Sequence, residues 1–228
     1  MNKKKTMYSE VAYFLGISIL ALGTAIMAKA DLGMSMVVAP AYLFYLKISQ
    51  TFSFFSFGMA EYCLQAILLI ILAIISRRIK LRYFLSFVTA VFYGIVLDIS
   101  IAIVGSDTMH MLSMRIVLFV GGLLLNTIGV SLLFHTYIAP EAYELFVKEI
   151  SDDYKKNINV VKVIYDCSSC ALSILLSFIF FGFGHFVGVN IGTIIAAFLN
   201  GLLIGCWSKL FEIIFDFRDC LKFGKYFE

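Results

Sequence analysis

The sequence predicts an all-α integral membrane protein of six transmembrane helices, arranged as two inverted three-helix repeats that each carry a broken or re-entrant Ala-Pro segment. Three observations predict this fold: an apolar composition, six long apolar segments, and two similar Ala-Pro stretches. Hydrophobic residues make up 61% of the 228 residues, charged residues only 14%, and the mean hydropathy is +0.96. Soluble domains carry about 25% charged residues. This chain cannot build a water-soluble surface, so its first partner is the lipid bilayer.

Six apolar segments have the length of about 20 residues that crosses a bilayer. They lie at residues 11–30, 58–75, 83–104, 114–135, 163–181 and 186–207. The stretch 37–57 is also apolar but is broken by Pro40, Lys47 and Gln50. We expect it to be re-entrant or interfacial, and a seventh span is the alternative. The first segment follows three lysines, as a signal peptide does, but no clear small-x-small cleavage site is followed by a soluble domain, and we expect the segment to be retained.

Basic residues are concentrated in the segments expected on one side of the membrane. Of 18 Lys and Arg residues, 15 lie before the first span, between the second and third, between the fourth and fifth, or after the sixth. The other three are Lys29, Lys47 and Arg115. The positive-inside rule therefore predicts that both termini lie in the cytoplasm. The net charge of +3 reflects this topology and indicates no nucleic-acid partner.

Both prolines of the chain lie in segments that share one order of residues, 39–49 and 139–151. Each contains Ala-Pro, Ala-Tyr, Leu-Phe, Lys and Ile-Ser, and only the second copy contains glutamates. Proline interrupts the helical hydrogen-bond ladder, and non-helical backbone at membrane depth must be buried or line a cavity. We therefore expect two chemically different gates or broken segments. Their proposed residues are Pro40, Tyr42, Pro140, Glu141, Tyr143 and Glu144.

Matched glycines extend this likeness along the chain. They are expected where helices approach closely, because small residues allow backbones to meet. Three spans is an odd number, so a second copy enters the membrane from the opposite face, which predicts inverted repeats at 1–110 and 111–228 within one compact membrane domain. A chance resemblance between two apolar sequences is the competing interpretation. The glycines proposed for helix packing are Gly16 and Gly23 with Gly122 and Gly129, and Gly94 with Gly201.

Polar residues inside the apolar segments are the candidates for a substrate or ion site, because such groups usually face the interior of a helix bundle. The set is Glu61, Gln65, Asp98, Asn126, Asp166 and Asn200. Other roles stay open for most of them. Glu61 and Asp166 come early enough to stabilise a helix N-terminus, and the two asparagines are candidates for interhelical hydrogen bonds. Outside this set, we expect Asp31 to pair with Lys29.

No motif in the sequence points to an enzyme, a cofactor or a metal. The CxxC spacing of Cys167 and Cys170 lies inside an apolar helix and lacks the second ligand pair of a zinc site. The three histidines are scattered, and no P-loop, dinucleotide fingerprint or nucleophile elbow is present. We expect the two cysteines of this CxxC to act as small residues that pack within the helix. Thiol redox chemistry is the alternative.

The segment 29–35, Lys-Ala-Asp-Leu-Gly-Met-Ser, resembles the YczE/YyaS/YitT group of bacterial membrane proteins. In that group the first helix ends in a similar Ala-x-Leu-Gly-x-x-Pro segment, which recurs in the second half. The resemblance covers most of the chain and implies a multispan protein of the bacterial inner membrane. Met36 stands where the group commonly has proline, so the resemblance assigns no ligand role to that loop.

The sequence thus favours secondary transport of a small solute by alternating access at a midplane site between the repeats. Two alternatives remain: a substrate-binding membrane subunit of a larger importer, and a non-transporting membrane regulator. The expected partners are the bilayer and a small-molecule or ion substrate. Association with itself or with a partner membrane subunit is left open.

Overall fold

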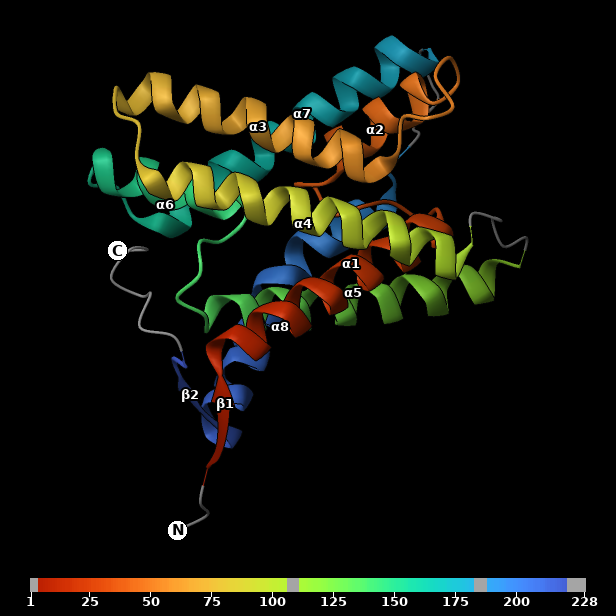
Figure 1. Ribbon diagram of the computed structural model, residues 1–228. Helices are drawn as coiled ribbons and strands as arrows, with labels where there is room; N and C mark the ends of the chain where they lie inside the picture. Colours follow the sequence, from red (N-terminus) through yellow and green to blue (C-terminus); the bar gives the residue numbers. More distant parts are fainter. Residues whose placement is uncertain (1–3, 106–110, 183–187, 221–228) are drawn as a thin grey trace.

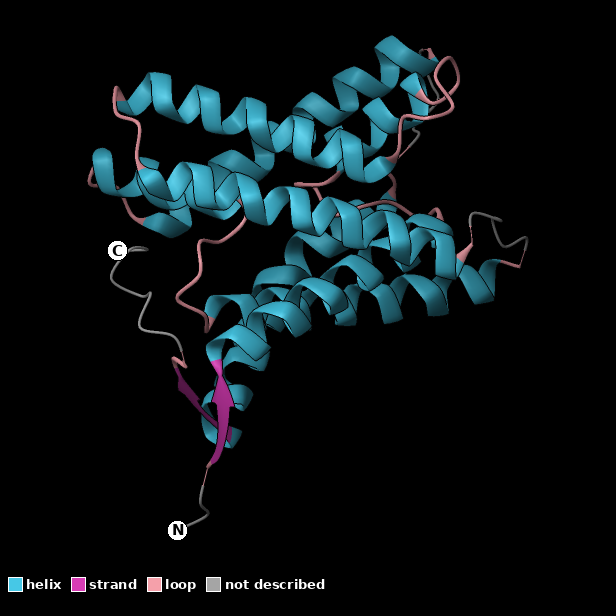
Figure 2. Ribbon diagram, in the orientation of Figure 1, coloured by secondary structure: helices cyan, strands magenta, loops and turns pink. Residues whose placement is uncertain are grey.

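The computed structural model describes residues 4–105, 111–182 and 188–220, which form eight α-helices and two short strands (Figures 1 and 2). Two of these helices are short: α2 (Ala39–Ile48) has 10 residues and α6 (Ala142–Asp153) has 12. At about 1.5 Å per residue, α2 is only about half as long as the hydrocarbon core is thick, so it is not a seventh span. Six helices are long and apolar enough to cross a membrane, as predicted: α1 (Ser9–Ala30), α3 (Phe57–Ser76), α4 (Leu81–Val104), α5 (Leu112–Phe134), α7 (Ile158–Phe181) and α8 (Ile191–Ile214).

The predicted and observed span boundaries differ most at the last helix. The predicted span 186–207 is shifted toward the N-terminus, and Phe186 lies outside the described residues. Helix α8 begins at Ile191 because Asn190 and Thr193 form a capping box that satisfies the first backbone N–H groups. The start of helix α3 is fixed by an N-cap, since Ser56 Oγ accepts a hydrogen bond from the Met59 amide at 3.1 Å.

The helices pack in two layers. One layer is held by contacts of α1 with α4 and α5 and of α5 with α8. The other is held by contacts of α2 with α3 and α7 and of α6 with α3 and α7. In Figure 1, α3 and α7 lie above α1, α5 and α8. The short helices α2 and α6 lie toward opposite ends of the molecule.

The centre of the first layer is the antiparallel crossing of α1 and α5. A Cβ on Gly23 would lie 2.8 Å from the carbonyl oxygen of Gly122, and one on Gly129 would lie 2.8 Å from that of Gly16. Backbones can approach this closely only where no side chain intervenes. The predicted packing role of these four glycines is therefore what the structure shows, and this pair of helices carries much of the buried core.

Among the described residues, the contacts between helices of the two layers are concentrated at α4, which packs on α3 and α6. Gly94 of α4 packs on Gly58 of α3, and a Cβ on Gly94 would lie 2.8 Å from the Gly58 carbonyl oxygen. The corresponding helices α7 and α8 make no comparable contact within the described residues. Nothing lies within 4 Å of the position of a Cβ on Gly201. The packing role expected for Gly201 is thus wrong in this conformation, because α7 does not approach α8.

One end of the bundle carries the α3–α4 loop, α6 and the two strands, and we call it the basic end. Here β1 (Lys5–Tyr8) pairs in parallel with β2 (Phe215–Arg218), with Lys5 opposite Phe215. At the opposite end, Asp31 closes α1 in a left-handed conformation with φ of 49°. Its carboxylate pairs with Arg115 at 3.0 Å rather than with Lys29 as expected. The Lys29 ammonium instead donates to the Val104 carbonyl at the end of α4.

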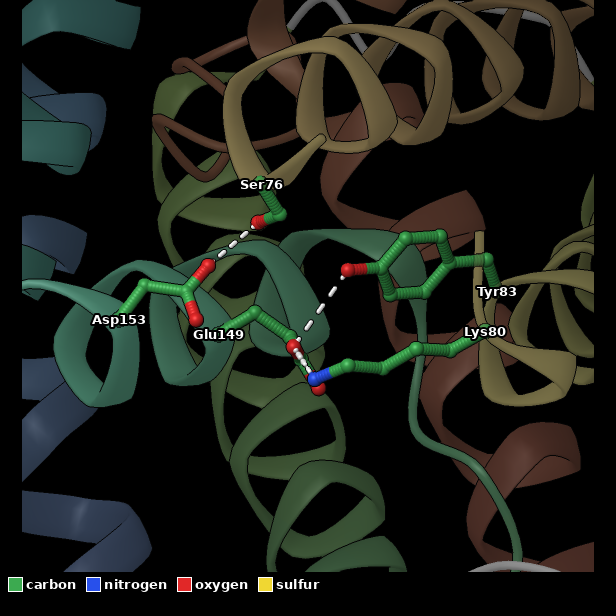
Figure 3. A network of polar contacts seen from close by, with 5 residues as sticks. All are labelled: Ser76, Lys80, Tyr83, Glu149 and Asp153. Atoms are coloured by element: carbon green, nitrogen blue, oxygen red, sulfur yellow. Dashed lines mark hydrogen bonds and ion pairs between the residues drawn. The ribbon is translucent and has the colours of Figure 1, made fainter. Parts of the chain in front are cut away.

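At the basic end, α6 is fastened to α3 and α4 by a network of polar side chains (Figure 3). The Glu149 carboxylate of α6 pairs with the Lys80 ammonium and accepts a longer hydrogen bond, 3.4 Å, from the Tyr83 hydroxyl. Asp153 accepts a 2.6 Å hydrogen bond from the Ser76 hydroxyl at the end of α3. Beneath these contacts the buried Leu145 packs in an apolar cluster with residues of α3 and α4. The second Ala-Pro segment therefore leads into a helix that is firmly held on one side.

Candidate functional site

A cavity of about 280 Å³ lies between the two layers, on the side where α7 and α8 stand apart. Helices α5, α6, α7 and α8 supply most of its wall, and the Pro140 segment lines its basic-end side. The segment 35–38, which precedes α2, and Tyr93 of α4 also reach it. Both halves of the chain therefore contribute to one space near the middle of the bundle.

Three oxygen atoms in this wall are buried and unpaired. Glu141 Oε1, Asp166 Oδ1 and Asn200 Oδ1 have no hydrogen-bond partner among the described residues. Leaving a buried acceptor unsatisfied costs about 1–3 kcal/mol, so such a group in a native structure calls for a partner from outside the chain, such as a water, an ion or a ligand. The three oxygens come from different elements, namely the start of α6, α7 and α8. Together they form a set of acceptors ready for a ligand that donates hydrogen bonds.

The same cavity contains one ion pair. The Lys162 ammonium of α7 donates to Glu144 Oε1 of α6 at 2.8 Å. Because this pair neutralises itself, the positive charge of Lys162 is committed to Glu144. Asp166 follows one helical turn after Lys162 and keeps an oxygen without a partner. The charge left over in the cavity is therefore acidic.

Behind the cavity, a fully buried carboxyl group supports the wall. Tyr143 lines the cavity, and its hydroxyl donates to Glu61 Oε2 of α3 at 2.7 Å. The other oxygen of Glu61 has no partner among the described residues. Gln65, one turn further along α3, accepts a hydrogen bond from the first amide of α6 at Ala142, at 3.1 Å. The predicted Glu61 and Gln65 stripe thus faces the interior, where it holds the start of α6 rather than lining the cavity.

A chain of hydrogen bonds ties the cavity to α1. Tyr93 of α4 donates to Thr24 Oγ1 at 3.0 Å, and the amide of Asn126 in α5 donates to the same oxygen at 3.1 Å. Thr24 in turn donates to the Leu20 carbonyl at 3.0 Å. Asn126 therefore lines the cavity with its amide already engaged, whereas Asn200 has a free oxygen. Sequence reasoning missed Thr24, whose only signal was a hydroxyl close to the paired glycines of α1.

Two hydroxyl groups of α4 hold the second Ala-Pro segment in place. Ser86 Oγ donates to the Pro140 carbonyl at 2.7 Å, and Thr89 Oγ1 donates to the Ala139 carbonyl at 3.0 Å. Non-helical backbone inside a bundle needs such partners for its carbonyl groups. Neither residue was predicted, although their three-residue spacing places them on one face of an apolar helix.

The Glu141 carboxyl lies at the start of α6, outside the membrane-spanning helices. Burial raises its pKa well above the usual range, and the nearby carboxyls of Glu61 and Glu144 raise the pKa further. The fold therefore favours the protonated form of the Glu141 carboxyl. A protonated carboxyl next to an acidic cavity can release its proton when a cation arrives, because the cation stabilises the charged form.

Residues 7–209 match the family of unknown function DUF6198, which covers most of the 228-residue chain. The chain belongs to this family. No curated protein and no solved structure matches the chain. Within the described residues, no three His, Cys, Asp or Glu side chains are grouped so that they could hold a metal ion.

In this DUF6198 member, the cavity brings together only part of the predicted set. It includes Asn126, Asp166 and Asn200 from the spans and Glu141 and Glu144 from the second Ala-Pro segment. The third glutamate of that segment, Glu149, pairs with Lys80 instead. Asp98 lies elsewhere: its carboxylate accepts hydrogen bonds from Ser56 Oγ at 2.6 Å and from the Gly58 amide at 2.8 Å. It therefore stabilises the N-terminus of α3. Pro40 and Tyr42 lie outside the cavity wall, and Tyr42 packs against Phe57 with ring centroids 5.1 Å apart.

A second cavity of about 550 Å³ adjoins the first at the basic end. The two share the wall residues Leu133, Phe134, Pro140 and Glu144. Its other wall residues include Arg82, Lys148 and Asp219. Charged side chains thus line both cavities, as expected along a path that leads from water into the bundle.

Proposed function

We propose that this protein is a secondary transporter of a small solute that carries positive charge or hydrogen-bond donors. The observation that carries the proposal is the cavity between the layers with the unpaired oxygens of Glu141, Asp166 and Asn200. A substrate amine or a similar cation would donate hydrogen bonds to these oxygens. Pro140, Glu141, Tyr143 and Glu144 would form the gate on the basic side, and Pro40 and Tyr42 the counterpart at the opposite end.

The paired helix contacts support an inverted-repeat arrangement for this transporter. Contacts of α2 with α7 and of α3 with α6 correspond under exchange of the two halves, as do those of α1 with α4 and of α5 with α8. Transporters built from inverted repeats hold their substrate near the midplane, at the interface of the repeats. With 15 of the 18 Lys and Arg residues predicted on one side, we assign the basic end to the cytoplasm and the protein to the bacterial plasma membrane.

The difference between the two halves supports alternating access. The Gly58–Gly94 contact closes the layers in the first half, while the equivalent place beside Gly201 is open. In the proposed cycle the halves exchange these conformations. The present conformation is then the one in which the site communicates with the basic end through the outer cavity.

The test is uptake of radiolabelled methylammonium and guanidinium by liposomes that contain the purified full chain. We expect saturable uptake that falls at least about tenfold in Asp166→Asn, because a charge-assisted hydrogen bond contributes about 1.5–3 kcal/mol. The matched control is Asp152→Asn, an exposed acid of α6 outside the cavity, which should behave as wild type. No uptake of either probe in either direction would contradict the proposal. Binding that requires Asp166 but occurs without flux would instead favour the importer-subunit interpretation.

A further inference from the structure

The inner cavity has an opening on its side, between α7 and α8. Val163 of α7 lines the cavity, yet its side chain is 60% exposed. Across the gap, Gly201 of α8 also lines the cavity and is exposed, with nothing within 4 Å of its Cβ position. The two residues therefore mark the edges of an opening, which we call the side opening.

The surface around the side opening is apolar. Ile164 on α7 is 61% exposed, and Phe198 and Leu202 on α8 are 76% and 69% exposed. All three belong to helices that are long and apolar enough to span the membrane. Side chains of this kind at such positions face lipid tails, because water would not cover them favourably. The side opening therefore leads into the bilayer, whereas the outer cavity leads toward the charged basic end.

Inside the side opening, the cavity is divided into an apolar part and a polar part. Leu20, Val130, Leu133 and Ile204 supply apolar walls. The unpaired oxygens of Glu141, Asp166 and Asn200 supply the acceptors, and the Lys162 ammonium is already paired with Glu144. A molecule that fits both parts has an apolar chain and a cationic, hydrogen-donating head.

We propose that the substrate class of this site is cationic amphiphiles, which enter from the bilayer through the side opening. This inference rests on the proposed function, since it concerns the same cavity. The head binds the oxygens of Asp166, Asn200 and Glu141, and the chain lies along the apolar wall and out between Val163 and Gly201. An anionic head on the same chain should bind poorly, because it would meet the Glu141 and Asp166 carboxyl groups, and the one lysine among the described residues of this wall, Lys162, is paired with Glu144.

The experiment uses the full chain in phosphatidylcholine nanodiscs and a twelve-carbon primary amine that carries a photoreactive diazirine at the tail. The matched probe is the alkyl sulfate with the same chain and diazirine. After illumination, labelled peptides are identified by mass spectrometry. The test variant is Gly201→Phe, which fills the side opening. Its control is Gly205→Phe, one turn along α8, where a Cβ also meets nothing within 4 Å and the residue does not line the cavity.

We expect the amine to label the α7 and α8 peptides that contain Val163 and Gly201, and the sulfate to label them only at the background level of bulk lipid. Asp166→Asn should lower amine labelling about tenfold, as the loss of one charge-assisted hydrogen bond predicts. Gly201→Phe should reduce it to background, while Gly205→Phe leaves it unchanged. Equal labelling by amine and sulfate, or labelling that Gly201→Phe does not alter, would overturn the proposal.

Methylammonium uptake by the wild-type protein separates this inference from the proposed function. If the wild-type protein takes up methylammonium while amine labelling is the same in Gly201→Phe as in wild type, entry from the bilayer is wrong and transport stands. If amine labelling depends on Gly201 and Asp166 while the wild-type protein takes up no methylammonium, the amphiphile site stands and the transport proposal fails.

Discussion

The carbonyl oxygen of Gly94 lies 2.0 Å from the point that a Cβ on Gly58 would occupy. The backbones of α3 and α4 therefore touch, and the two layers are closed on this side. Gly201, the counterpart of Gly94 in the second half, has open space at the same point. One molecule thus contains a closed and an open version of a similar helix pair, and the cavity lies at the open one.

Replacing Gly58, the glycine at the closed contact between α3 and α4, should destabilise the protein. In Gly58→Ala the new methyl group overlaps the Gly94 backbone, which cannot move aside as a side chain would. Overpacking of this kind costs about 1–3 kcal/mol or more, and we expect a lower midpoint of thermal unfolding in detergent micelles. Gly205→Ala is the control, because it gains helix propensity in open space and should be neutral or more stable by about 0.5–1 kcal/mol. Equal stability of the two variants would mean that α3 and α4 do not touch.

The two asparagines of the cavity should respond in opposite ways to the same substitution. Asn200→Leu removes a buried oxygen that has no partner, so we expect the ligand-free protein to gain about 1 kcal/mol of stability and to lose substrate binding. Asn126→Leu removes the hydrogen bond to Thr24, leaves that hydroxyl with one partner fewer, and should lower the stability. Thermal unfolding of both variants without ligand checks this. A loss of stability in Asn200→Leu would show that its oxygen is paired in the ligand-free protein.

The Glu141 carboxyl should make stability depend on pH. Its pKa is raised in the folded protein, so between the unfolded and folded pKa values the native state holds more protons, and stability falls as pH rises. Glu141→Gln removes this loss. We expect the variant to match wild type near pH 4 and to become increasingly more stable than wild type toward pH 8. A stability difference that does not change over this pH range would contradict the burial of a neutral carboxyl group at this position.

The polar network of Figure 3 should control how firmly α6 is held. Glu149 is nearly buried, so Lys80→Met leaves its carboxylate without a cation. Because the Lys80 side chain is 39% exposed, the expected cost is about 1–2 kcal/mol, less than for a fully buried pair. Hydrogen exchange of the α6 amides should speed up in Lys80→Met. In the control Arg78→Met, an exposed residue of the same loop, exchange should be unchanged.

The number of spans and the interior-facing acids could be predicted because they depend on local patterns. A run of about 20 apolar residues has to span, and a carboxyl group within it has to face the bundle interior. The role of Asp98 could not be predicted, since its partners Ser56 and Gly58 lie 42 and 40 residues away. The same holds for Ser86 and Thr89, whose acceptors are backbone carbonyls of a distant segment.

Gly201 shows a different limit of prediction from the sequence. Its match to Gly94 predicted a helix contact, and the contact is absent because α7 and α8 stand apart here. Two similar sequences can adopt different packing when a protein has more than one stable arrangement. In the proposed transport cycle, the packing of each half depends on the state of the molecule, which a sequence repeat does not specify.

Distances between spin labels on the two helix pairs test the central claim of alternating access most directly. One pair joins Cys63 of α3 to Ile95→Cys of α4, and the other joins Ile164→Cys of α7 to Leu202→Cys of α8, each with the remaining cysteines replaced by serine. All four positions are exposed. In nanodiscs we expect two populations for each pair, with the α7–α8 distance shortening as the α3–α4 distance lengthens when an amine substrate is added. A single unchanged distance for both pairs, in the presence of bound substrate, would contradict the account.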